Sequence, residues 1–299
     1  MKSFSLRKQP LLLAATAALA LTLSACGGTG GGASPSSTDE APYKVAENVS
    51  VTGSPTFDAI KSSGKVRIGV KQDQPGLGFK DAATGEYSGF DIEIAQWVAA
   101  SLGLSKDKIE FKPIPSANRE SAITNGDIDY YVGTYSITDK RKQLIDFAGP
   151  YFVTGQGLLV KKDNSTIKTE KDLAGKNVCS ATGSTPIQNI KANFPNTKTT
   201  EFDTYSQCVE ALKSGQVDAV TTDQAILIGY AAQEPDTLKV VGEPFTTEKY
   251  GIGLKKGDTA LRQFINKTLT DGGSVWQKIY DKTLGQSGTK VQQPAVDNY

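Results

Sequence analysis

The residues with the clearest chemistry are Arg141 and the hydroxyl side chains just before it. Residues 128–132 are β-branched and aromatic and predict a strand, and residues 133–138 (Gly-Thr-Tyr-Ser-Ile-Thr) predict a loop at its end. An arginine guanidinium can bind a carboxylate through two parallel hydrogen bonds, and neighbouring hydroxyls can saturate the remaining lone pairs. The stretch therefore predicts a carboxylate receptor, with a solvated surface turn as the alternative. Its candidate binding residues are Thr134, Tyr135, Ser136 and Arg141.

The pattern around this loop occurs a second time. Residues 122–134 align without gaps on residues 211–223, and both segments predict a helix end, a glycine turn and a strand. Because ligands of α/β sheets bind beyond the carboxyl ends of the strands, Thr134 and Asp223 are expected at matching ends of two similar lobes. If the lobes face each other, Arg141 can bind a carboxylate and Asp223 an ammonium group. The repeat therefore predicts a receptor for a free amino acid.

The composition excludes several classes of function. The chain has 299 residues, enough for one or two domains, and its formal net charge of +1 indicates no polyanionic partner. Histidine is absent, which removes histidine-based triads and histidine-ligated metals. No glycine-rich phosphate loop follows a predicted strand. We therefore expect no cofactor, no metal, no nucleic-acid partner and no enzymatic activity.

The N-terminus predicts export. A basic start (Lys2, Arg7 and Lys8) precedes an apolar run of 13 residues at 11–23, which is too short to span a bilayer. The next residues, Leu-Ser-Ala-Cys26, resemble the bacterial lipobox, in which the cysteine is lipidated and becomes the first mature residue; a plain signal peptide is the alternative. The segment that follows is rich in Gly, Ser, Thr and Pro and predicts a flexible tether.

The two remaining cysteines, Cys179 and Cys208, predict a disulfide, because an even pair in an exported protein more often forms a bond than two thiols. Cys179 ends a predicted strand, and Cys208 lies early in the helix before the second copy of the repeat. Both belong to the same predicted lobe, so a bond between them would not obstruct movement of one lobe against the other.

Three further candidates lie near predicted strand ends in the first half of the chain. Lys71 follows the first predicted strand, residues 64–70, and Phe79 lies in the turn-rich loop after it. Arg119 opens a helix after the strand at 109–114. A cation at this position opposes the helix dipole, and this small cost favours a functional role over the alternative of an ordinary first-turn residue. For Lys71 and Phe79, a solvated loop lysine and a packing phenylalanine are the alternatives.

The first long predicted helix begins with an acidic pair. Asp91 and Glu93 lie in its first turn, where the helix dipole favours carboxylates. We interpret this pair as helix capping rather than as an acid–base pair. The chain closes with one predicted helical stretch at 261–284 and a polar tail.

A second candidate anion site lies at the start of a later helix. After the strand at 175–179, Thr185 is predicted at the cap position and Pro186 in the first turn. Free amides there can hold an anionic ligand group together with the hydroxyls of Thr182, Ser184 and Thr185, or the hydroxyls can simply cap the helix.

Two glycine-containing strands, at 155–160 and 250–254, flank this second lobe and are typical of a two-strand hinge. They predict one lobe inserted into the other. The expected organisation is a lipoprotein signal peptide (1–25), a tether (26–55), the first part of lobe 1 (56–155), lobe 2 (156–250), and the second part of lobe 1 with the tail (251–299).

Taken together, residues 57–285 resemble the bacterial solute-binding proteins of ABC importers, polar amino acid family. The resemblance is carried by Gly-Phe-Asp-Ile-Glu-Ile-Ala at 89–95, by Ser-Ile-Thr at 136–138 through Arg141, and by Thr-Thr-Asp at 221–223. It implies a periplasmic-binding-protein-like fold, with two α/β lobes joined by two hinge strands and the ligand between them. It also implies that Arg141 binds the α-carboxylate and Asp223 the ammonium group.

Within that family, Asn118-Arg119 and Lys71 resemble the glutamate/aspartate-binding branch, in which two cations hold the side-chain carboxylate. Lysine stands at 71 where some relatives carry arginine, so a bidentate contact is lost there. The number of cations agrees with an acidic ligand, because one cation matches the α-carboxylate and two remain for a side-chain carboxylate. Preference for L-glutamate over aspartate rests on the resemblance alone.

The resemblance implies a monomer on the outer face of the cytoplasmic membrane, held by a lipid (palmitate) anchor on Cys26, that delivers L-glutamate to the transmembrane subunits of an ABC permease. The alternatives are a receptor for glutamine or aspartate, a ligand-sensing module, or a dehydratase-like enzyme. An enzyme would need a general acid or base in the cleft, and the sequence predicts no glutamate there.

Overall fold

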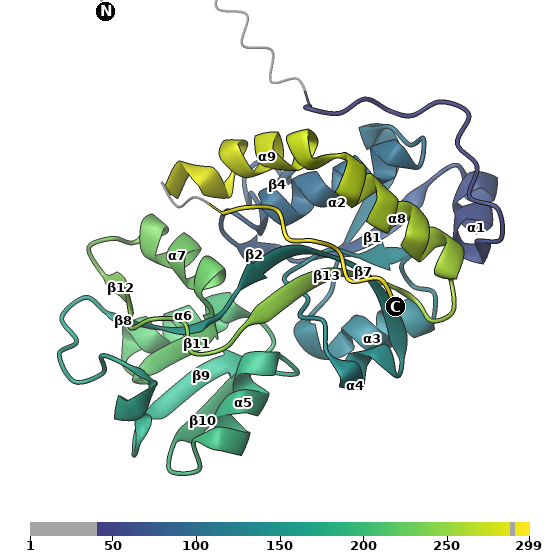
Figure 1. Cartoon of the computed structure of the whole chain (residues 1–299). Coiled ribbons are helices and arrows are strands. Elements are labelled where there is room, and N and C mark those ends of the chain that lie inside the picture. Colours follow the sequence, from purple (N-terminus) through teal and green to yellow (C-terminus); the bar gives the residue numbers. More distant parts are fainter. Residues whose placement is uncertain (1–40, 288–290) are drawn as a thin grey trace, which may run out of the picture. The chain divides into compact units, whose positions relative to one another are not determined.

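The computed structural model describes residues 41–287 and 291–299 (Figure 1). The predicted signal peptide, Cys26 and the first part of the tether lie outside the described residues. Within the described ranges, every helix is too short or too polar to cross a bilayer.

The first lobe is built on a five-stranded sheet with the order β5-β1-β6-β13-β7. β1 lies parallel between β5 and β6, whereas β13 runs antiparallel to both of its neighbours. Helices α2, α8 and α9 lie on one side of this sheet and α3 and α4 on the other (Figure 1). The strands are β1 (Val66–Val70), β5 (Ile109–Pro113), β6 (Tyr130–Tyr131), β7 (Ile145–Thr154) and β13 (Glu248–Lys255). The helices are α1 (Pro55–Ser63), α2 (Phe90–Ser101), α3 (Arg119–Thr124), α4 (Asp139–Lys142), α8 (Thr259–Asp271) and α9 (Gly273–Lys282).

The second lobe repeats the arrangement with the order β10-β9-β11-β8-β12. β9 lies parallel between β10 and β11, as β1 lies between β5 and β6 in lobe 1, and β8 runs antiparallel to β11 and β12. β6 and β11 therefore occupy equivalent places, as the sequence repeat predicts. The strands are β8 (Gln156–Lys161), β9 (Asn177–Ala181), β10 (Lys198–Phe202), β11 (Ala219–Asp223) and β12 (Leu238–Val241), and the helices are α5 (Thr185–Asn193), α6 (Tyr205–Ser214) and α7 (Gln224–Gln233).

Short elements complete both lobes. A small antiparallel sheet, β2-β3-β4, extends from lobe 1. Its strands are β2 (Asp73–Gln74), β3 (Gly78–Lys80) and β4 (Tyr87–Ser88), and the 3-10 turns are η1 (Lys106–Lys108), η2 (Ser116–Asn118), η3 (Glu170–Leu173) and η4 (Leu284–Ser287).

Two hinge strands connect the lobes, which confirms the predicted fold class. The chain passes from β7 into β8 through Gly155, and returns through β13. A Cβ at Gly155 would lie 2.2 Å from the Thr246 carbonyl oxygen, and the Gln156 N–H donates to Thr246 Oγ1 at 2.9 Å. The two crossing segments therefore lie against each other, and only glycine fits at 155.

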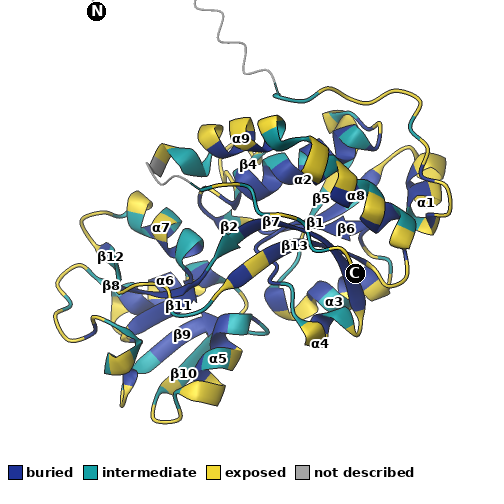
Figure 2. Ribbon diagram, viewed as in Figure 1, coloured by how far each residue is buried: buried dark blue, intermediate teal, exposed yellow. Residues whose placement is uncertain are grey.

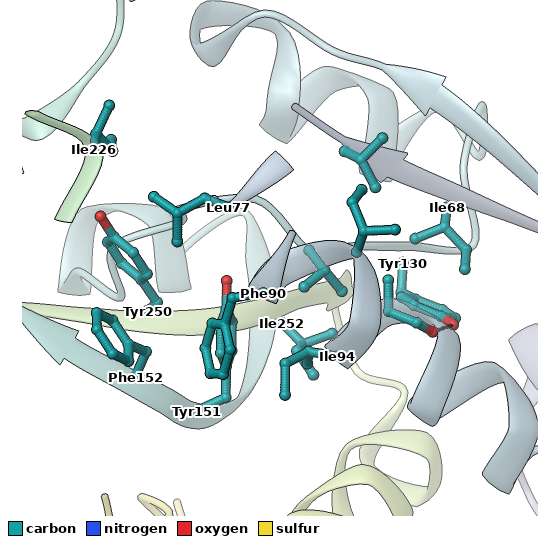
Figure 3. Close-up of a cluster of buried hydrophobic side chains, with 14 of the residues drawn as sticks. Ile68, Leu77, Phe90, Ile94, Tyr130, Tyr151, Phe152, Ile226, Tyr250 and Ile252 are labelled. Atoms are coloured by element: carbon teal, nitrogen blue, oxygen red, sulfur yellow. Dashed lines mark hydrogen bonds between the residues drawn. The ribbon is translucent and has the colours of Figure 1, made fainter. Parts of the chain in front are cut away.

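The core of lobe 1 reaches the hinge through aromatic side chains (Figure 3). Phe90 begins α2 and packs with its ring centroid 5.4 Å from that of Phe152 on β7 and 5.8 Å from that of Trp276 on α9. Tyr151 of β7 and Tyr250 of β13 lie beside them. In Figure 2 the sheets are buried and the outward faces of the helices are exposed. The hydrophobic core is therefore continuous with the strands that carry the hinge.

Several predicted elements need correction. Residues 41–54, assigned to the tether, pack on lobe 1: Val51 is buried, and the Ala46 N–H donates to the Ala100 carbonyl at 2.8 Å. The stretch at 261–284 forms two helices rather than one. They meet at Gly272, where a Cβ would lie 2.1 Å from the Trp97 ring, so the α2 tryptophan occupies the space a side chain would need.

The C-terminal segment, residues 291–299, lies along β7 instead of hanging free. The Asp297 N–H donates to the Gly149 carbonyl at 2.7 Å, and the Tyr299 hydroxyl accepts from the Phe147 N–H at 2.8 Å. The Tyr299 ring lies between the charged groups of Lys142 and Arg262, 4.3 and 4.1 Å from its centroid.

The structure confirms the disulfide between Cys179 on β9 and Cys208 on α6, with 5.5 Å between their Cα atoms. Both residues are buried in lobe 2. The bond closes a loop with a sequence separation of 29 residues and fixes α6 to the sheet that it covers.

We expect the double variant Cys179→Ser/Cys208→Ser to lower the free energy of unfolding by about 3–4 kcal/mol, because the open chain regains loop entropy when unfolded. Urea unfolding of the oxidised wild type and the variant measures the difference. Reducing agent should destabilise the wild type and leave the variant unchanged; a variant as stable as the wild type would contradict the expectation.

Candidate functional site

Three cationic side chains are buried together in lobe 1. Lys71 follows β1, Arg119 opens α3 and Arg141 lies in α4, and each is at most 5% exposed. Lys71 Nζ donates to Ser116 Oγ at 2.8 Å and approaches the Ile114 carbonyl at 3.3 Å. All three cations stand beyond the carboxyl ends of parallel strands, as the sequence predicts.

The Tyr135 ring separates the two guanidinium groups. Its centroid lies 4.2 Å from Cζ of Arg119 and 4.8 Å from Cζ of Arg141. The ring is fully buried and packs edge-on against Phe147 at 4.9 Å. Stacking on an aromatic face partly compensates a guanidinium for lost water, so Tyr135 holds both arginines in fixed places.

Arg141 is oriented by acceptors from both lobes. Its Nε is 3.1 Å from Glu120 Oε1, and Nη1 donates to the Ser136 carbonyl at 2.7 Å. Nη2 donates to the carbonyl of Gly183 in lobe 2 at 3.1 Å. The guanidinium therefore faces the opposite lobe directly, at the loop that precedes α5.

Burial makes this cluster electrostatically unfavourable on its own. Burial, with a further contribution from the Arg119 guanidinium, lowers the pKa of Lys71 to about 7, against an opposing effect of Asp73. Burial and Arg119 also lower the pKa of Arg141. Among the described ion pairs, Glu120 is the acid that contacts the cluster. An anionic ligand group would relieve the excess positive charge.

The loop after β6 is held in a rare backbone conformation. Thr134 has φ = 45°, a left-handed value that β-branched residues seldom adopt. Its N–H donates to Asp91 Oδ2 at 2.9 Å, its hydroxyl bonds Gln74 Oε1 at 3.1 Å, and its carbonyl accepts from Arg119 Nη1 at 3.3 Å. These bonds fix the strained loop that carries Tyr135 and Ser136.

Asp91 is therefore misassigned as a helix cap. The N-cap residue of α2 is Gly89, with no side-chain capping bond, and Asp91 is fully buried. Its carboxylate accepts from the Thr134 N–H and from the Tyr151 hydroxyl, the latter at 2.8 Å. Burial raises the pKa of Asp91 to about 6, although both hydrogen bonds oppose the rise. Asp91 therefore stabilises the site loop through its hydrogen bond with the Thr134 N–H.

Asp223 ends β11 in lobe 2 and has one unpaired oxygen. Oδ2 accepts from the Tyr250 hydroxyl at 2.6 Å, whereas Oδ1 is buried with no hydrogen-bond partner in the described part of the chain. Burial, and then the nearby Glu248 carboxylate, raise the pKa of Asp223 to about 7; Arg119 and Arg141 act in the opposite direction. The structure thus brings Asp223 and the arginines of lobe 1 to one site.

Glu248 is a site residue that the sequence did not reveal. It is 7% exposed, at the hinge end of β13, and its Oε2 accepts from Thr185 Oγ1 at 3.0 Å. Thr185 also reaches Ser136 Oγ in lobe 1 at 3.3 Å. The expectation of a cleft without glutamate is therefore wrong. The one available signal was its place just before the predicted hinge strand.

Thr185 itself differs from its prediction. The N-cap of α5 is Ser184, whose side chain accepts from the Ile187 N–H. Because Ser184 caps the helix, the Thr185 hydroxyl is available for the contacts between the lobes.

Two predicted residues make their described contacts with groups other than the three cations. Thr182 Oγ1 bonds the Phe202 carbonyl at 3.3 Å and joins the ends of β9 and β10. Phe79 is half-buried on β3, where it pairs with Asp73. Their part in binding stays a prediction.

A separate apolar cavity of about 680 Å³ lies beside α7 and the hinge strands, with Pro75, Phe152, Ile228, Tyr280 and Leu284 in its lining. None of the ten predicted binding residues lines it. Its lining lacks the charges that give the cluster its chemistry, so it is not the candidate site.

The fold is that of a two-lobed protein with a cluster of charged side chains where the lobes meet. Residues 66–286 match the family model of bacterial extracellular solute-binding proteins, family 3. The chain therefore belongs to this family, whose members bind solutes such as amino acids outside the cytoplasm and deliver them to ABC permeases.

Individual relatives are named for different ligands. Glutamate-binding protein GluB of Corynebacterium efficiens is 43% identical over 249 residues, which cover 79% of this chain and 84% of that protein. The ABC transporter glutamine-binding protein GlnH of Bacillus subtilis is also 43% identical, over 77% of this chain and 84% of that protein. A solved structure of an ancestral arginine-binding protein bound to arginine matches with a TM-score of 0.69 at 41% identity, covering 74% of this chain and 99% of that one.

We expect Tyr135→Leu to lower the affinity for the bound amino acid about tenfold or more, because both arginines lose the aromatic face that positions them. Tyr135→Phe retains the ring and is the matched control, with affinity within about twofold of the wild type. Isothermal titration calorimetry measures both. Equal affinities of the leucine and phenylalanine variants would contradict a positioning role for the ring.

Proposed function

We propose that this chain captures L-glutamate between its lobes and delivers it to an ABC permease. The observation that carries the proposal is the distribution of charge: lobe 1 holds three buried cations, and lobe 2 holds a buried aspartate whose Oδ1 has no hydrogen-bond partner among the described residues. A free dicarboxylic amino acid has the complementary pattern, with two carboxylates and one ammonium group.

In this proposal each ligand group has its own partner. Arg141 binds the α-carboxylate together with the Ser136 and Thr134 groups beside it, and Asp223 Oδ1 accepts from the ammonium group. Lys71 and Arg119 bind the side-chain carboxylate. Charge-assisted hydrogen bonds contribute about 1.5–3 kcal/mol each, so two extra cations favour a dicarboxylate strongly.

Glutamine and arginine fit the same charges less well. A neutral amide would leave Lys71 and Arg119 desolvated without an anion, and a cationic side chain would be repelled. Relatives named for glutamate and for glutamine are equally identical to this chain, so the buried cations, rather than the identities, favour glutamate.

The proposal also covers the oligomeric state of the protein, its attachment to the membrane and whether it alters its ligand. The protein acts as a monomer, and a lipid on Cys26 holds it at the outer face of the membrane. It releases its ligand unchanged, although Glu248 and Lys71 are groups that could exchange protons in the cleft. Recovery of unaltered glutamate after long incubation, measured by mass spectrometry, tests this; a new product would establish an enzyme.

We expect Arg141→Ala to lower glutamate affinity at least about 100-fold, because two charge-assisted bonds are lost. Lys71→Ala should mainly shift the preference from glutamate towards glutamine. Lys112→Ala, at a partly exposed lysine on β5 of the same lobe, is the control. Calorimetry with both amino acids measures the affinities, and wild-type-like glutamate binding by the first two variants would remove the site assignment.

We expect glutamate affinity to be greatest near pH 7. The pKa of free Lys71 is about 7, and a bound carboxylate raises it, so binding takes up a proton and weakens as the pH rises above 7. The pKa of free Asp223 is also about 7, and a bound ammonium lowers it, so binding releases a proton and weakens as the pH falls below 7.

Calorimetry between pH 5.5 and about 8.5 tests both limbs, whose slopes approach tenfold per pH unit. Lys71→Arg, which stays charged throughout, should lose the alkaline limb and retain the acidic one. Glutamine should show little alkaline limb with the wild type. An identical alkaline limb for glutamate and glutamine would contradict the role of Lys71.

A further inference from the structure

Away from the charged cluster, Asp73 of lobe 1 bonds two helices of lobe 2. Its Oδ2 accepts from the Ser206 N–H in the first turn of α6, at 3.1 Å. The Tyr230 hydroxyl of α7 donates to the Asp73 carbonyl and lies 3.3 Å from Oδ2. Tyr230 is 7% exposed, so the contact is largely removed from water.

The contact with α6 is electrostatically favourable. The first amides of a helix lack partners within the helix, and a carboxylate there also interacts with the helix dipole. The cap of α6, Thr204, satisfies the Gln207 N–H, which leaves the Ser206 N–H for Asp73. The disulfide at Cys208 joins α6 to β9, so a contact with this helix holds the lobe rather than a loose segment.

The next residues of the same segment fit closely against α7. A Cβ at Gly229 would lie 2.3 Å from the Pro75 carbonyl oxygen, far inside van der Waals contact. Gly229 lies in the interior of α7, where glycine is otherwise unfavourable. Its presence is explained by the approach of lobe 1, and this approach exists only while the lobes are together.

We propose that residues 73–75 form an interlobe latch, with Ser206, Gly229 and Tyr230 as its receiving residues, and that this latch sets how long the amino acid is retained. The proposal rests on capture of an amino acid between the lobes, but not on which amino acid is bound. Residues of the latch do not contact the ligand; they position the lobes around it.

The mechanism is a shift of population. Opening the lobes breaks the Asp73 and Tyr230 bonds and returns their groups to water, so the latch stabilises the closed arrangement only. Because the apparent affinity scales with the fraction of binding-competent molecules, loss of the latch weakens binding without altering the site. The main change is expected in the dissociation rate.

Asp73 also acts on the site at a distance, since its charge raises the pKa of Lys71. In Asp73→Ala, loss of this charge and loss of the latch should change the ligand affinity in opposite directions. Removing a negative charge near an anion-binding cluster should strengthen the binding of an acidic ligand, whereas loss of the latch should weaken it. Gly229→Ala and Tyr230→Phe leave the charge unchanged, so they isolate the latch.

The test begins with a screen of the amino acids for the one that raises the melting temperature of the wild type most. The dissociation rate of that amino acid is then measured by stopped flow. We expect Asp73→Ala to raise this rate about tenfold and Tyr230→Phe about threefold, with the double variant below the product of the two because they share one contact. Glu110→Gln removes the same charge from an exposed site of lobe 1 and should leave the rate within about twofold.

Gly229→Ala separates closure from folding. Alanine is the better helix former, so the melting temperature of the ligand-free variant should be unchanged or higher, while dissociation is expected to be at least about fivefold faster. In hydrogen exchange of the ligand-bound protein, the Ser206 amide should exchange faster in Asp73→Ala than in the wild type.

Unchanged dissociation in both Asp73→Ala and Gly229→Ala would overturn the latch, as would an equal acceleration in Glu110→Gln. These outcomes are independent of the glutamate assignment. If another amino acid gives the largest thermal shift, the proposed ligand fails, and the same rates measured with that amino acid still decide the latch.

Discussion

The structure depends on the burial of three like charges, two of which are stacked on one aromatic ring. Lys71, Arg119 and Arg141 are each nearly inaccessible to water, and the Tyr135 ring lies between the two guanidiniums. Such a cluster is unfavourable unless the surrounding structure holds it. The strained loop at Thr134, the buried Asp91 carboxylate and the Glu120 ion pair supply that support.

The second lobe contributes negative charge near the buried cations of the first. Asp223 stands at the strand end equivalent to that of Thr134, and its charge is likewise disfavoured by burial and by Glu248. Each lobe therefore holds charge that only the other lobe, or a ligand between them, can compensate. The Arg141 bond to the Gly183 carbonyl and the Thr185 bond to Ser136 show how closely the two halves approach.

Sequence alone was sufficient for features that depend on local pattern or on the repeat. The placement of Arg141 and Asp223 could be predicted because each follows a recognisable strand, and the matching topology of β6 and β11 accounts for the alignment. Asp91 could not be assigned, because its partner Thr134 is 43 residues away and a first-turn acid is normally a cap. Glu248 shares this difficulty, since its contact with Thr185 spans 63 residues.

The C-terminal segment covers part of an edge strand. β7 is the last strand of its sheet, and such a strand offers unpaired amides and carbonyls to any other extended chain. Residues 297–299 occupy part of that border through Gly149 and Phe147, with the final ring inserted between two cations. These residues therefore cover part of the edge that β7 would otherwise offer to another extended chain.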